Sequence, residues 1–512
     1  MCGIAGIWGR ADGEADLQSM TDALAHRGPD AEGTFVRPGV GRLSHRRLSI
    51  VDPAGGNQPI LGRGGSLAIV ANGEIYNAPE LRPSLTGQHR FTTKSDSEVL
   101  LHLYDAHGPQ AVADLDGMYA VAIADGDQLF LVRDPIGIKP LYYQELGDTL
   151  TFASELKAFR AGTRHVREFP PGTAYSSASG FSTFYTVPDP APLEDATEAH
   201  TSRVRETLER AVTKQLMSDV PLGVFLSGGL DSSIIAALVR PHVNELHTFS
   251  VGVEGSPDLD AARLVARYLG TTHHEHRLTP DEVIAHLPHI IFALESFDQD
   301  LVRSAIPTYF TARLAAQHVK VVLTGEGADE LFAGYRYYWD ITDHQLLHHE
   351  LRRSVATLHN VNLQRVDRMT MAHSLEGRVP FLDLRMVELA LAIPARLKLP
   401  TLRRPEKWIL RVAVSDLLPP EVTWRDKAQF DEGSGTVDLL AALIENMTDG
   451  LKPPSYRQDH PEVWLRSAEE CYYHRLLLEV FDDPEPILAN VGRWVDRNNF
   501  PHPERRADTA DR

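Results

Sequence analysis

Two short stretches of this chain carry residue types that could do chemistry. In the first, Cys2 directly follows Met1, so removal of Met1 would place a free α-amine beside a thiol. An α-amine with a pKa of about 8 can accept the proton of a thiol with a pKa of about 8.5, which produces a nucleophile. The alternative interpretation is that position 2 simply holds a small residue that permits removal of the initiator.

The second stretch is SGGLDSS, residues 227–233, which follows an apolar run and precedes a helical pattern. Its glycines let the backbone approach an anion, and a helix N-terminus presents N–H groups to that anion. The pattern predicts a phosphate cradle without the lysine of a GxxxxGK[ST] loop. Asp231 would repel a phosphate unless a cation lay between them, which indicates Mg²⁺. A plain glycine-rich strand-to-helix turn is the alternative.

The composition limits the kind of protein that can hold these stretches. With 512 residues, 43% of them hydrophobic and 24% charged, the chain has the material for two or three globular domains. A net charge of −19 argues against a nucleic-acid partner. The sequence shows neither a membrane-length apolar run nor a secretory signal, and its two cysteines are too few for a disulfide framework. We therefore expect a cytoplasmic protein that has no membrane partner.

Elements that could position Cys2 are short and rich in β-structure. Apolar or alternating runs bounded by Gly, Asp and Asn predict strands at 67–70, 119–124 and 128–132, and the apolar spacing at 97–107 predicts a helix. Such strands are typical of packed antiparallel sheets. The segment 186–198 is rich in proline and acidic residues and has no periodicity, which indicates a linker.

The pattern after the linker is different. Helices and strands alternate in an order that we expect to run helix 201–218, strand 221–226, helix 232–240, strand 247–253, helix 259–269 and strand 319–323. This alternation predicts an α/β domain with a doubly wound parallel sheet, and from about residue 331 the chain is mostly helical. The predicted domains are 2–190 and 200–500, followed by a disordered tail at 501–512.

A set of longer motifs resembles known families. SGGLDSS resembles the PP-loop of the ATP pyrophosphatases, and the N-terminal half resembles the class II, N-terminal-nucleophile glutamine amidotransferases. Both parts in this order resemble the glutamine-hydrolysing asparagine synthetases. The matching runs span nearly the whole chain and are CGIAGIWG from Cys2, HRGPD from His26, HRRLSIVD from His45, NGEIYN from Asn72, SDSE from Ser95, TGEGADELFAGY from Thr324, LEGRVPFLD from Leu375, EKWILR from Glu406 and DKAQF from Asp426.

The resemblance implies an N-terminal glutaminase domain of antiparallel sheets sandwiched by helices. In it, Cys2 would attack the glutamine amide, and Asn72 and Gly73 would form the oxyanion hole. Arg47 would bind the glutamine α-carboxylate, while Asp96 and Glu74 would hold the α-ammonium and the amide. From the residues alone, Arg47 could be a surface charge and Asp96 a helix N-cap.

For the C-terminal domain, the resemblance implies ATP as a substrate and Mg²⁺ as a cofactor. Asp231 and Asp329 would bind Mg²⁺, Lys427 would neutralise charge on the α-phosphate, and Glu326 would assist the attack of ammonia. The ATP and pyrophosphate contacts would come from Leu226, Ser227, Gly228, Gly229, Asp231, Ser232, Ser233 and Gly325. Without the motif match, Lys427 would be a solvated charge and the carboxylates of Glu326, Asp329 and Glu330 an acidic helix N-terminus.

Together the implied roles describe an amidotransferase that adenylates a carboxylate and aminates it with ammonia from glutamine. Aspartate is the expected acceptor, and a homodimer is compatible with the resemblance. The alternatives are another small carboxylate, or a cyclase like the β-lactam synthetases or lasso-peptide cyclases. Such cyclases generally need no glutaminase, so the presence of Cys2 favours ammonia as the nucleophile, as does Glu326 where β-lactam synthetases tend to carry tyrosine. Gly377 departs from the alanine that is more frequent in the family.

Two further clusters have structural explanations. His273, His274 and His276 are metal-ligand types, but they fall where a strand is expected, and alternate residues of a strand face opposite sides. The aromatic residues at 335–339 could stack on a ligand, although packing at a helix end is the simpler expectation.

Overall fold

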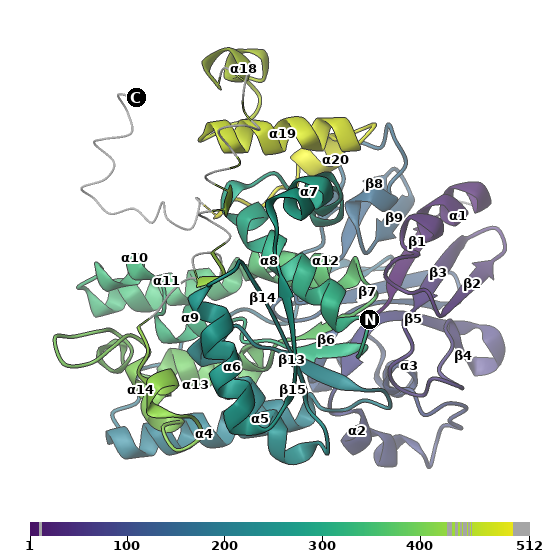
Figure 1. Ribbon diagram of the computed structural model, residues 1–512. Coiled ribbons are helices and arrows are strands. Elements are labelled where there is room, and N and C mark those ends of the chain that lie inside the picture. Colours follow the sequence, from purple (N-terminus) through teal and green to yellow (C-terminus); the bar gives the residue numbers. More distant parts are fainter. Residues whose placement is uncertain are drawn as a thin grey trace.

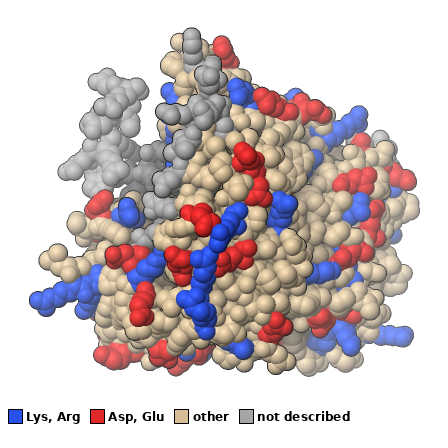
Figure 2. All heavy atoms as spheres, in the orientation of Figure 1, with Lys and Arg blue, Asp and Glu red and all other residues tan. Residues whose placement is uncertain are grey.

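The computed structural model describes residues 1–9, 13–426, 433–435, 439–440, 443, 448, 451 and 453–494. Lys427 and the predicted tail at 501–512 lie outside these described residues. Within them, no helix is long and apolar enough to cross a membrane. Acidic and basic side chains are interspersed over the face of the molecule in Figure 2.

Two six-stranded antiparallel sheets form the N-terminal half (Figure 1). The first has the order β10-β8-β9-β1-β3-β2, made of β1 Gly3–Trp8, β2 Ala31–Arg37, β3 Gly41–Arg47, β8 Tyr142–Leu146, β9 Thr149–Ala153 and β10 Arg167–Glu168. The second has the order β12-β11-β7-β6-β5-β4, made of β4 Ile60–Gly62, β5 Leu67–Ile75, β6 Gly117–Asp125, β7 Gln128–Arg133, β11 Thr173–Ser176 and β12 Gly180–Thr183.

These sheets pack on each other and are covered on their outer faces by helices. Helix α1 (Glu14–Ala23) contacts β1 and β3 of the first sheet, and α3 (Asp96–His107), joined by α2 (Ala78–Leu85), contacts β5 of the second. Strand β5 also contacts β1 and β3 across the interface between the sheets. The arrangement confirms the predicted α+β half with antiparallel sheets between helices.

Strand β6 shows how the sequence specifies this sandwich. Its small residues Ala120, Ala122 and Ala124 face the other sheet, whereas Tyr119, Val121 and Ile123 pack beneath the helices, so side chains of different size alternate along the strand. Both faces are buried because a strand in the middle of a sandwich has no solvent side.

A five-stranded parallel sheet forms the centre of the C-terminal half, in the order β15-β14-β13-β16-β17. Its strands are β13 Leu222–Phe225, β14 His247–Gly252, β15 Thr272–Arg277, β16 Val321–Leu323 and β17 Glu376–Arg378. The helices around it are α4 Thr197–Lys214, α5 Leu230–Val239, α6 Pro257–Leu269, α7 Pro280–Leu294, α8 Gln299–Ala315, α9 Ala328–Phe332, α10 Arg336–Trp339, α11 His344–Ala356, α12 Asn362–Met371, α13 Leu384–Ala392, α14 Trp408–Ala413, α15 Pro420–Thr423, α18 Pro453–Asp459, α19 Ala468–Val480 and α20 Glu485–Leu488.

The connections of this sheet place helices on both faces. The chain moves outward from β13 through α5, β14 and α6 to β15, and then returns through α7 and α8 to β16. Because such crossovers are right-handed, the outward and returning helices cover opposite faces, and α6 and α8 accordingly both contact β14. This confirms the doubly wound sheet. The sequence did not predict β17, a three-residue strand within a stretch expected to be mostly helical.

Strands β13 and β16 are neighbours at the point where the strand order reverses. Their carboxyl ends lead into the two motifs SGGLDSS and TGEGADE. Ligands of doubly wound sheets bind at such a switch point, so the topology alone brings the two motifs to one crevice.

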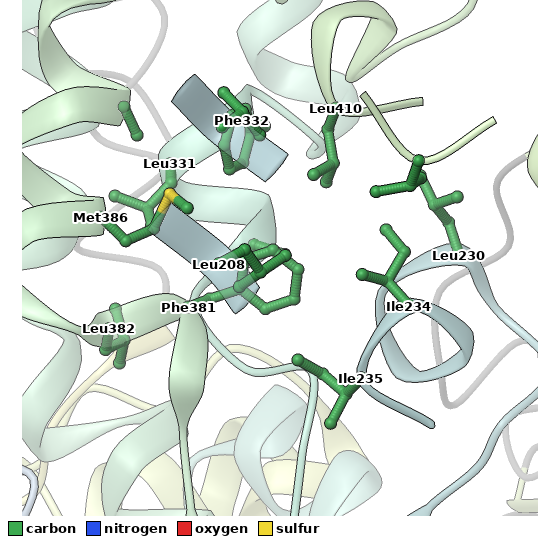
Figure 3. Close-up of a cluster of buried hydrophobic side chains, with 14 of the residues drawn as sticks. Leu208, Leu230, Ile234, Ile235, Leu331, Phe332, Phe381, Leu382, Met386 and Leu410 are labelled. Carbon is green, nitrogen blue, oxygen red and sulfur yellow. The ribbon is translucent and has the colours of Figure 1, made fainter. Parts of the chain in front are cut away.

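A buried apolar cluster holds the walls of this crevice together (Figure 3). Leu230 and Ile234 come from α5, Leu331 and Phe332 from α9, and Leu410 from α14. Each of these helices begins beside the crevice, so packing of their apolar side chains fixes the relative positions of the residues at their N-termini.

The two halves are joined by a buried network of ion pairs. Arg27 is fully buried, and its Nη1 atom lies 2.6 Å from Glu155 Oε1 and 2.7 Å from Asp367 Oδ2. Arg368 pairs with the same Glu155 at 3.3 Å and with Glu295 at 2.8 Å. Glu155 thus lies between cations from both halves, and none of these charges can return to water while the halves stay together.

Replacement of Arg27 tests this network. Arg27→Ala leaves Glu155 and Asp367 short of a buried partner, so we expect the free energy of unfolding to fall by about 3–5 kcal/mol in urea denaturation. Arg37→Ala, which breaks the exposed pair with Asp127, is the matched control and should change it by less than about 1 kcal/mol. Equal effects of the two variants would contradict the structural role of the network.

Candidate functional site

Cys2 lies at the start of β1, inside the N-terminal sandwich. The register of β1 against β3 pairs Gly3 with Arg46 and so brings Cys2 opposite Arg47. The Cys2 backbone N–H donates to Asn72 Oδ1 at 2.9 Å, and its thiol lies 4.0 Å from the Leu48 carbonyl. Burial raises the pKa of the thiol, so a nearby base is needed to generate the thiolate.

Asn72 and Gly73 sit next to Cys2 on β5. Asn72 is fully buried, and among the described residues its Nδ2 atom finds no hydrogen-bond acceptor although its Oδ1 atom is used. An unused donor beside a nucleophile is what an oxyanion hole requires. A Cβ at Gly73 would lie 2.0 Å from the Met118 carbonyl oxygen on the paired strand, which explains why this position is glycine.

Two buried carboxylates, Glu74 and Asp96, complete this region. Burial and the neighbouring Asp96 and Glu376 carboxylates raise the pKa of Glu74 well above its usual value. The Asp96 carboxylate accepts a hydrogen bond from the Ile75 N–H at 2.7 Å, and burial raises its pKa. The alternative interpretation of Asp96 as the N-cap of α3 is wrong, because Ser95 is the N-cap and accepts from the Ser97 N–H.

The C-terminal half contributes directly to this N-terminal region. The Met1 ammonium lies 3.0 Å from Glu376 Oε2, and Arg378 lies between Glu376 and Glu74 at 2.6 and 3.7 Å. Although desolvation opposes it, the ammonium and Arg378 lower the pKa of Glu376 to about 2. Glu376 and Arg378 belong to β17, so an edge strand of the parallel sheet supplies charges to the surroundings of Cys2. Neither residue was predicted to lie at a site.

Arg47 is placed near Cys2 but is occupied by its own loop. Its Nη1 atom donates to the Pro53 carbonyl and Asn57 Oδ1, and its Nη2 atom donates to the carbonyls of Val51 and Asp52. The side chain therefore organises the segment 51–57, and binding of a carboxylate would exchange some of these hydrogen bonds. Its predicted role stays a prediction.

SGGLDSS forms the turn between β13 and α5. The hydroxyls of Ser227 and Ser232 lie 3.1 Å apart, and that of Ser233 donates to the Gly229 carbonyl at 2.7 Å. Gly228 has a φ of +72°, and a Cβ there would lie 2.5 Å from the Ala262 backbone nitrogen, so only glycine fits this turn.

Lys407 connects the two predicted metal ligands. Its Nζ atom lies 2.6 Å from Asp231 Oδ2 and 2.5 Å from Asp329 Oδ1. The lysine is 2% exposed, and although burial opposes it the two carboxylates raise its pKa. Lys407 lies in the run EKWILR but was not predicted to be a site residue; the available signal was a lysine immediately before an apolar helix.

A cavity of about 260 Å³ is lined by most of the site residues that were predicted for the C-terminal half. It is lined by Leu226, Ser227, Gly229, Asp231, Ser232, Gly325, Glu326, Asp329 and Lys407, among others. Glu326 pairs with Arg365 within this cavity, and burial raises the pKa of the glutamate. The structure therefore brings together most of the predicted synthetase residues, whereas Lys427 lies outside the described part of the chain.

The other clusters have the expected structural roles. His273, His274 and His276 lie on β15, where His273 contacts Thr248 and His274 stacks on His318. In the aromatic cluster, Tyr337 and Tyr338 donate hydrogen bonds to Glu350 and Ser354 of α11, which confirms packing, while Tyr335 also lines the cavity.

The fold and its two sites define a two-part enzyme of the amidotransferase class. Residues 1–185 match the glutamine amidotransferase domain family, and residues 203–346 and 339–486 match the asparagine synthase family. The chain is 38% identical to a glutamine-hydrolysing asparagine synthetase of Asparagus officinalis, in an alignment that covers 94% of this chain and 86% of the relative. It is also 38% identical to one of Arabidopsis thaliana, with 96% of this chain and 89% of the relative covered. A probable glutamine-hydrolysing asparagine synthetase of Schizosaccharomyces pombe is 37% identical, in an alignment that covers 98% of this chain and 97% of the relative.

These matches identify the chain as a member of the glutamine-hydrolysing asparagine synthetase family. The family resemblance predicted from the motifs is thereby confirmed.

Asn72→Ala tests the unused donor beside Cys2. Loss of one oxyanion donor should lower kcat for glutamine hydrolysis by about 10²–10³-fold, measured as glutamate released. Asn77→Ala, which alters the same NGEIYN motif but whose side chain hydrogen-bonds Asp114 and Asp116, should leave this kcat within about threefold. A similar loss in both variants would show that Asn72 acts only through the local fold.

Lys407→Met tests the cation at the phosphate cradle. We expect ATP–pyrophosphate exchange to fall by about 100-fold, because the variant removes charge stabilisation while preserving most of the side-chain volume. Lys398→Met is the matched control, since Lys398 is a second buried lysine, its pKa lowered to about 7 by burial, and it does not line the cavity. Equal losses in the two variants would assign Lys407 a purely structural role.

Proposed function

We propose that this protein makes asparagine from aspartate, with ATP as the activating substrate and glutamine as the nitrogen donor. The observation that carries the proposal is the coexistence, in one chain, of a buried thiol beside an unused amide donor and a glycine-rich cradle with two carboxylates and a lysine. The family membership supports the pairing of these sites.

In the proposed glutaminase reaction, removal of Met1 exposes the α-amine of Cys2. The amine accepts the thiol proton, and the thiolate attacks the side-chain carbonyl carbon of glutamine. Asn72 Nδ2 and the Gly73 N–H donate to the resulting oxyanion, and the ammonium returns the proton as ammonia leaves. Water then hydrolyses the thioester to glutamate. Glu74, Asp96 and Arg47 hold the substrate amide and its charged α-groups.

In the proposed synthetase reaction, a carboxylate oxygen of aspartate attacks the α-phosphorus of ATP and pyrophosphate leaves. The residues at 226–233 and Gly325 bind the phosphates, and Lys407 and Lys427 offset their charge. Ammonia then displaces AMP from the acyl adenylate, and Glu326 accepts its proton. A buried carboxylate with a raised pKa suits that role.

Mg²⁺ fits the same carboxylates. Among the described residues, Asp231 Oδ1 is buried without a hydrogen-bond donor, and Asp231 and Asp329 are joined through one lysine. Two carboxylates facing phosphate oxygens form the ligand set that Mg²⁺ prefers. The ion would supply charge neutralisation between the carboxylates and pyrophosphate.

Aspartate suits the remaining cavity wall. Besides the phosphate cradle, the cavity is lined by Arg365, Asp300, Glu330 and Asn362. The guanidinium of Arg365 can bind a carboxylate, and the carboxylates of Asp300 and Glu330 can bind an ammonium. An acceptor with both charges therefore matches this wall better than a simple acid.

The proposed reaction also sets the surroundings in which the protein works. Small soluble substrates and an intracellular ATP supply fit a cytoplasmic enzyme that needs neither nucleic acid nor membrane. A homodimer stays an expectation from the family resemblance.

ATP–pyrophosphate exchange with a panel of carboxylates tests the acceptor. We expect aspartate to stimulate exchange at least tenfold more than succinate, β-alanine or glutamate, and EDTA to abolish it. Stimulation by other acids but not by aspartate would overturn the asparagine proposal.

Cys2→Ala separates the two sites in the same preparation. It should abolish glutamine-dependent synthesis and retain synthesis from ammonium chloride, whereas Cys471→Ala should retain both. Loss of ammonium-dependent synthesis in Cys2→Ala alone would contradict two separable sites.

A further inference from the structure

A compact group of metal-ligand side chains lies in the N-terminal half, outside both sites. His102 and Asp105 are three residues apart on α3, and His89 belongs to the loop that precedes this helix. One ligand atom from each residue falls within 4.8 Å of the other two. The three come from segments already brought together by the fold, so no domain movement is needed to assemble them.

His102 has an unusual environment for a buried imidazole. The residue is 6% exposed, and among the described residues neither ring nitrogen makes a hydrogen bond. Its ring packs against those of His89 and Phe91, with centroids 4.8 and 4.6 Å away. Ring packing accounts for the position of His102, whose Nε2 atom lies 3.6 Å from Glu98 Oε1, beyond hydrogen-bond distance. A buried polar atom without a partner costs free energy, which a bound ligand would recover.

The ring nitrogens of His102 make no hydrogen bond among the described residues, so either of them could offer a lone pair to a metal ion. A neutral imidazole offers a lone pair, and this is the form that divalent transition metals bind.

Asp105 is held where its carboxylate could bind the same metal ion as the two histidines. Arg63 donates to one of its carboxylate oxygens, Oδ1, and the other, Oδ2, lies 3.4 Å from His89 Nδ1. Ligand atoms about 2.1 Å from a tetrahedral metal lie roughly 3.4 Å from each other, so this pair already has the required spacing. Arg63 thus has the place of an outer residue that orients a ligating carboxylate.

Glu98 also lies beside His102, but its carboxylate is occupied by other hydrogen bonds. Its carboxylate accepts hydrogen bonds from the backbone and hydroxyl groups of Thr92 and Thr93, at 2.6–2.8 Å. It lies 3.6 Å from His102 Nε2, which suits an outer partner. Two histidines and one aspartate therefore remain as ligands.

We propose that His89, His102 and Asp105 form a binding site for a divalent first-row transition metal such as Zn²⁺, with a fourth position open to water. Two imidazoles and a carboxylate are a ligand set that Zn²⁺ and Co²⁺ accept in proteins. This site is independent of the proposed Mg²⁺ at the phosphate cradle, which uses oxygen ligands only.

The site would act on the glutaminase region through α3. This helix begins at Asp96, whose carboxylate holds the Ile75 N–H, and the loop at 88–95 carries His89. A metal that joins His89 to His102 closes this loop onto the helix two turns from Asp96. Metal at 100 times its Kd should therefore slow local opening of residues 88–95 by about 100-fold in hydrogen exchange.

Co²⁺ binding to the full-length protein tests the proposal. Equilibrium dialysis and the visible absorption of tetrahedral Co²⁺ should show one site in the wild type that His89→Gln and Asp105→Asn lose, with affinity lowered at least tenfold. His107→Gln, an exposed histidine on the same helix, is the matched control and should bind as the wild type does. Circular dichroism spectra that match the wild type establish that the variants fold.

Two results would overturn the proposal. One is the absence of a tetrahedral Co²⁺ spectrum together with unchanged exchange at 88–95, which would leave the cluster as ring packing only. The other is equal Co²⁺ binding by wild type, His89→Gln and Asp105→Asn, which would place the bound metal at other histidines.

Discussion

Burial of opposite charges between the two halves is the constraint on which both sites depend. Arg27 and Arg368, one from each half, share Glu155 in a region closed to water. A buried charge is tolerated only with its partners, so separation of the halves would leave several charges unpaired at once. The halves are thereby held in one relative position, which suits the proposed use in one half of ammonia that is released in the other. Ammonia escaping into water at neutral pH would be protonated and lost as a nucleophile.

The same arrangement, a basic side chain between two carboxylates, is found at each site. Arg378 lies between Glu376 and Glu74 near Cys2, and Lys407 lies between Asp231 and Asp329 at the phosphate cradle. Each of these cations offsets only one of the two carboxylates that it contacts, so neither group carries a net positive charge by itself. In a chain with a net charge of −19, these buried cations keep the carboxylates close together without leaving them all unpaired.

Features that depend on local sequence patterns could be predicted from the sequence, whereas features that depend on contacts between distant residues could not. The alternation in β6 and the turn at SGGLDSS are local patterns, and motif resemblance extended the prediction to Asn72 and Asp329. Lys407 escaped prediction because its partner Asp231 is 176 residues away, and no local pattern marks such a contact. Strand β17 escaped because three residues carry no period, and its pairing depends on a sheet formed much earlier in the chain. The alternative role of Asp96 as the N-cap of α3 was wrong because Ser95, the residue before it, is also of a type that suits a helix start and is the N-cap.

Strand β17 also sets the order in which the protein can mature on the ribosome. The sandwich that holds Cys2 is complete in sequence by Thr183, yet Glu376 and Arg378 are synthesised almost two hundred residues later. At about 5–20 residues per second, the nascent amidotransferase half waits roughly 10–40 seconds for these charges. During that interval Glu74 lacks its cation, and the surroundings of the thiol are incomplete. The surroundings of Cys2 are thus completed only when most of the C-terminal half has been made.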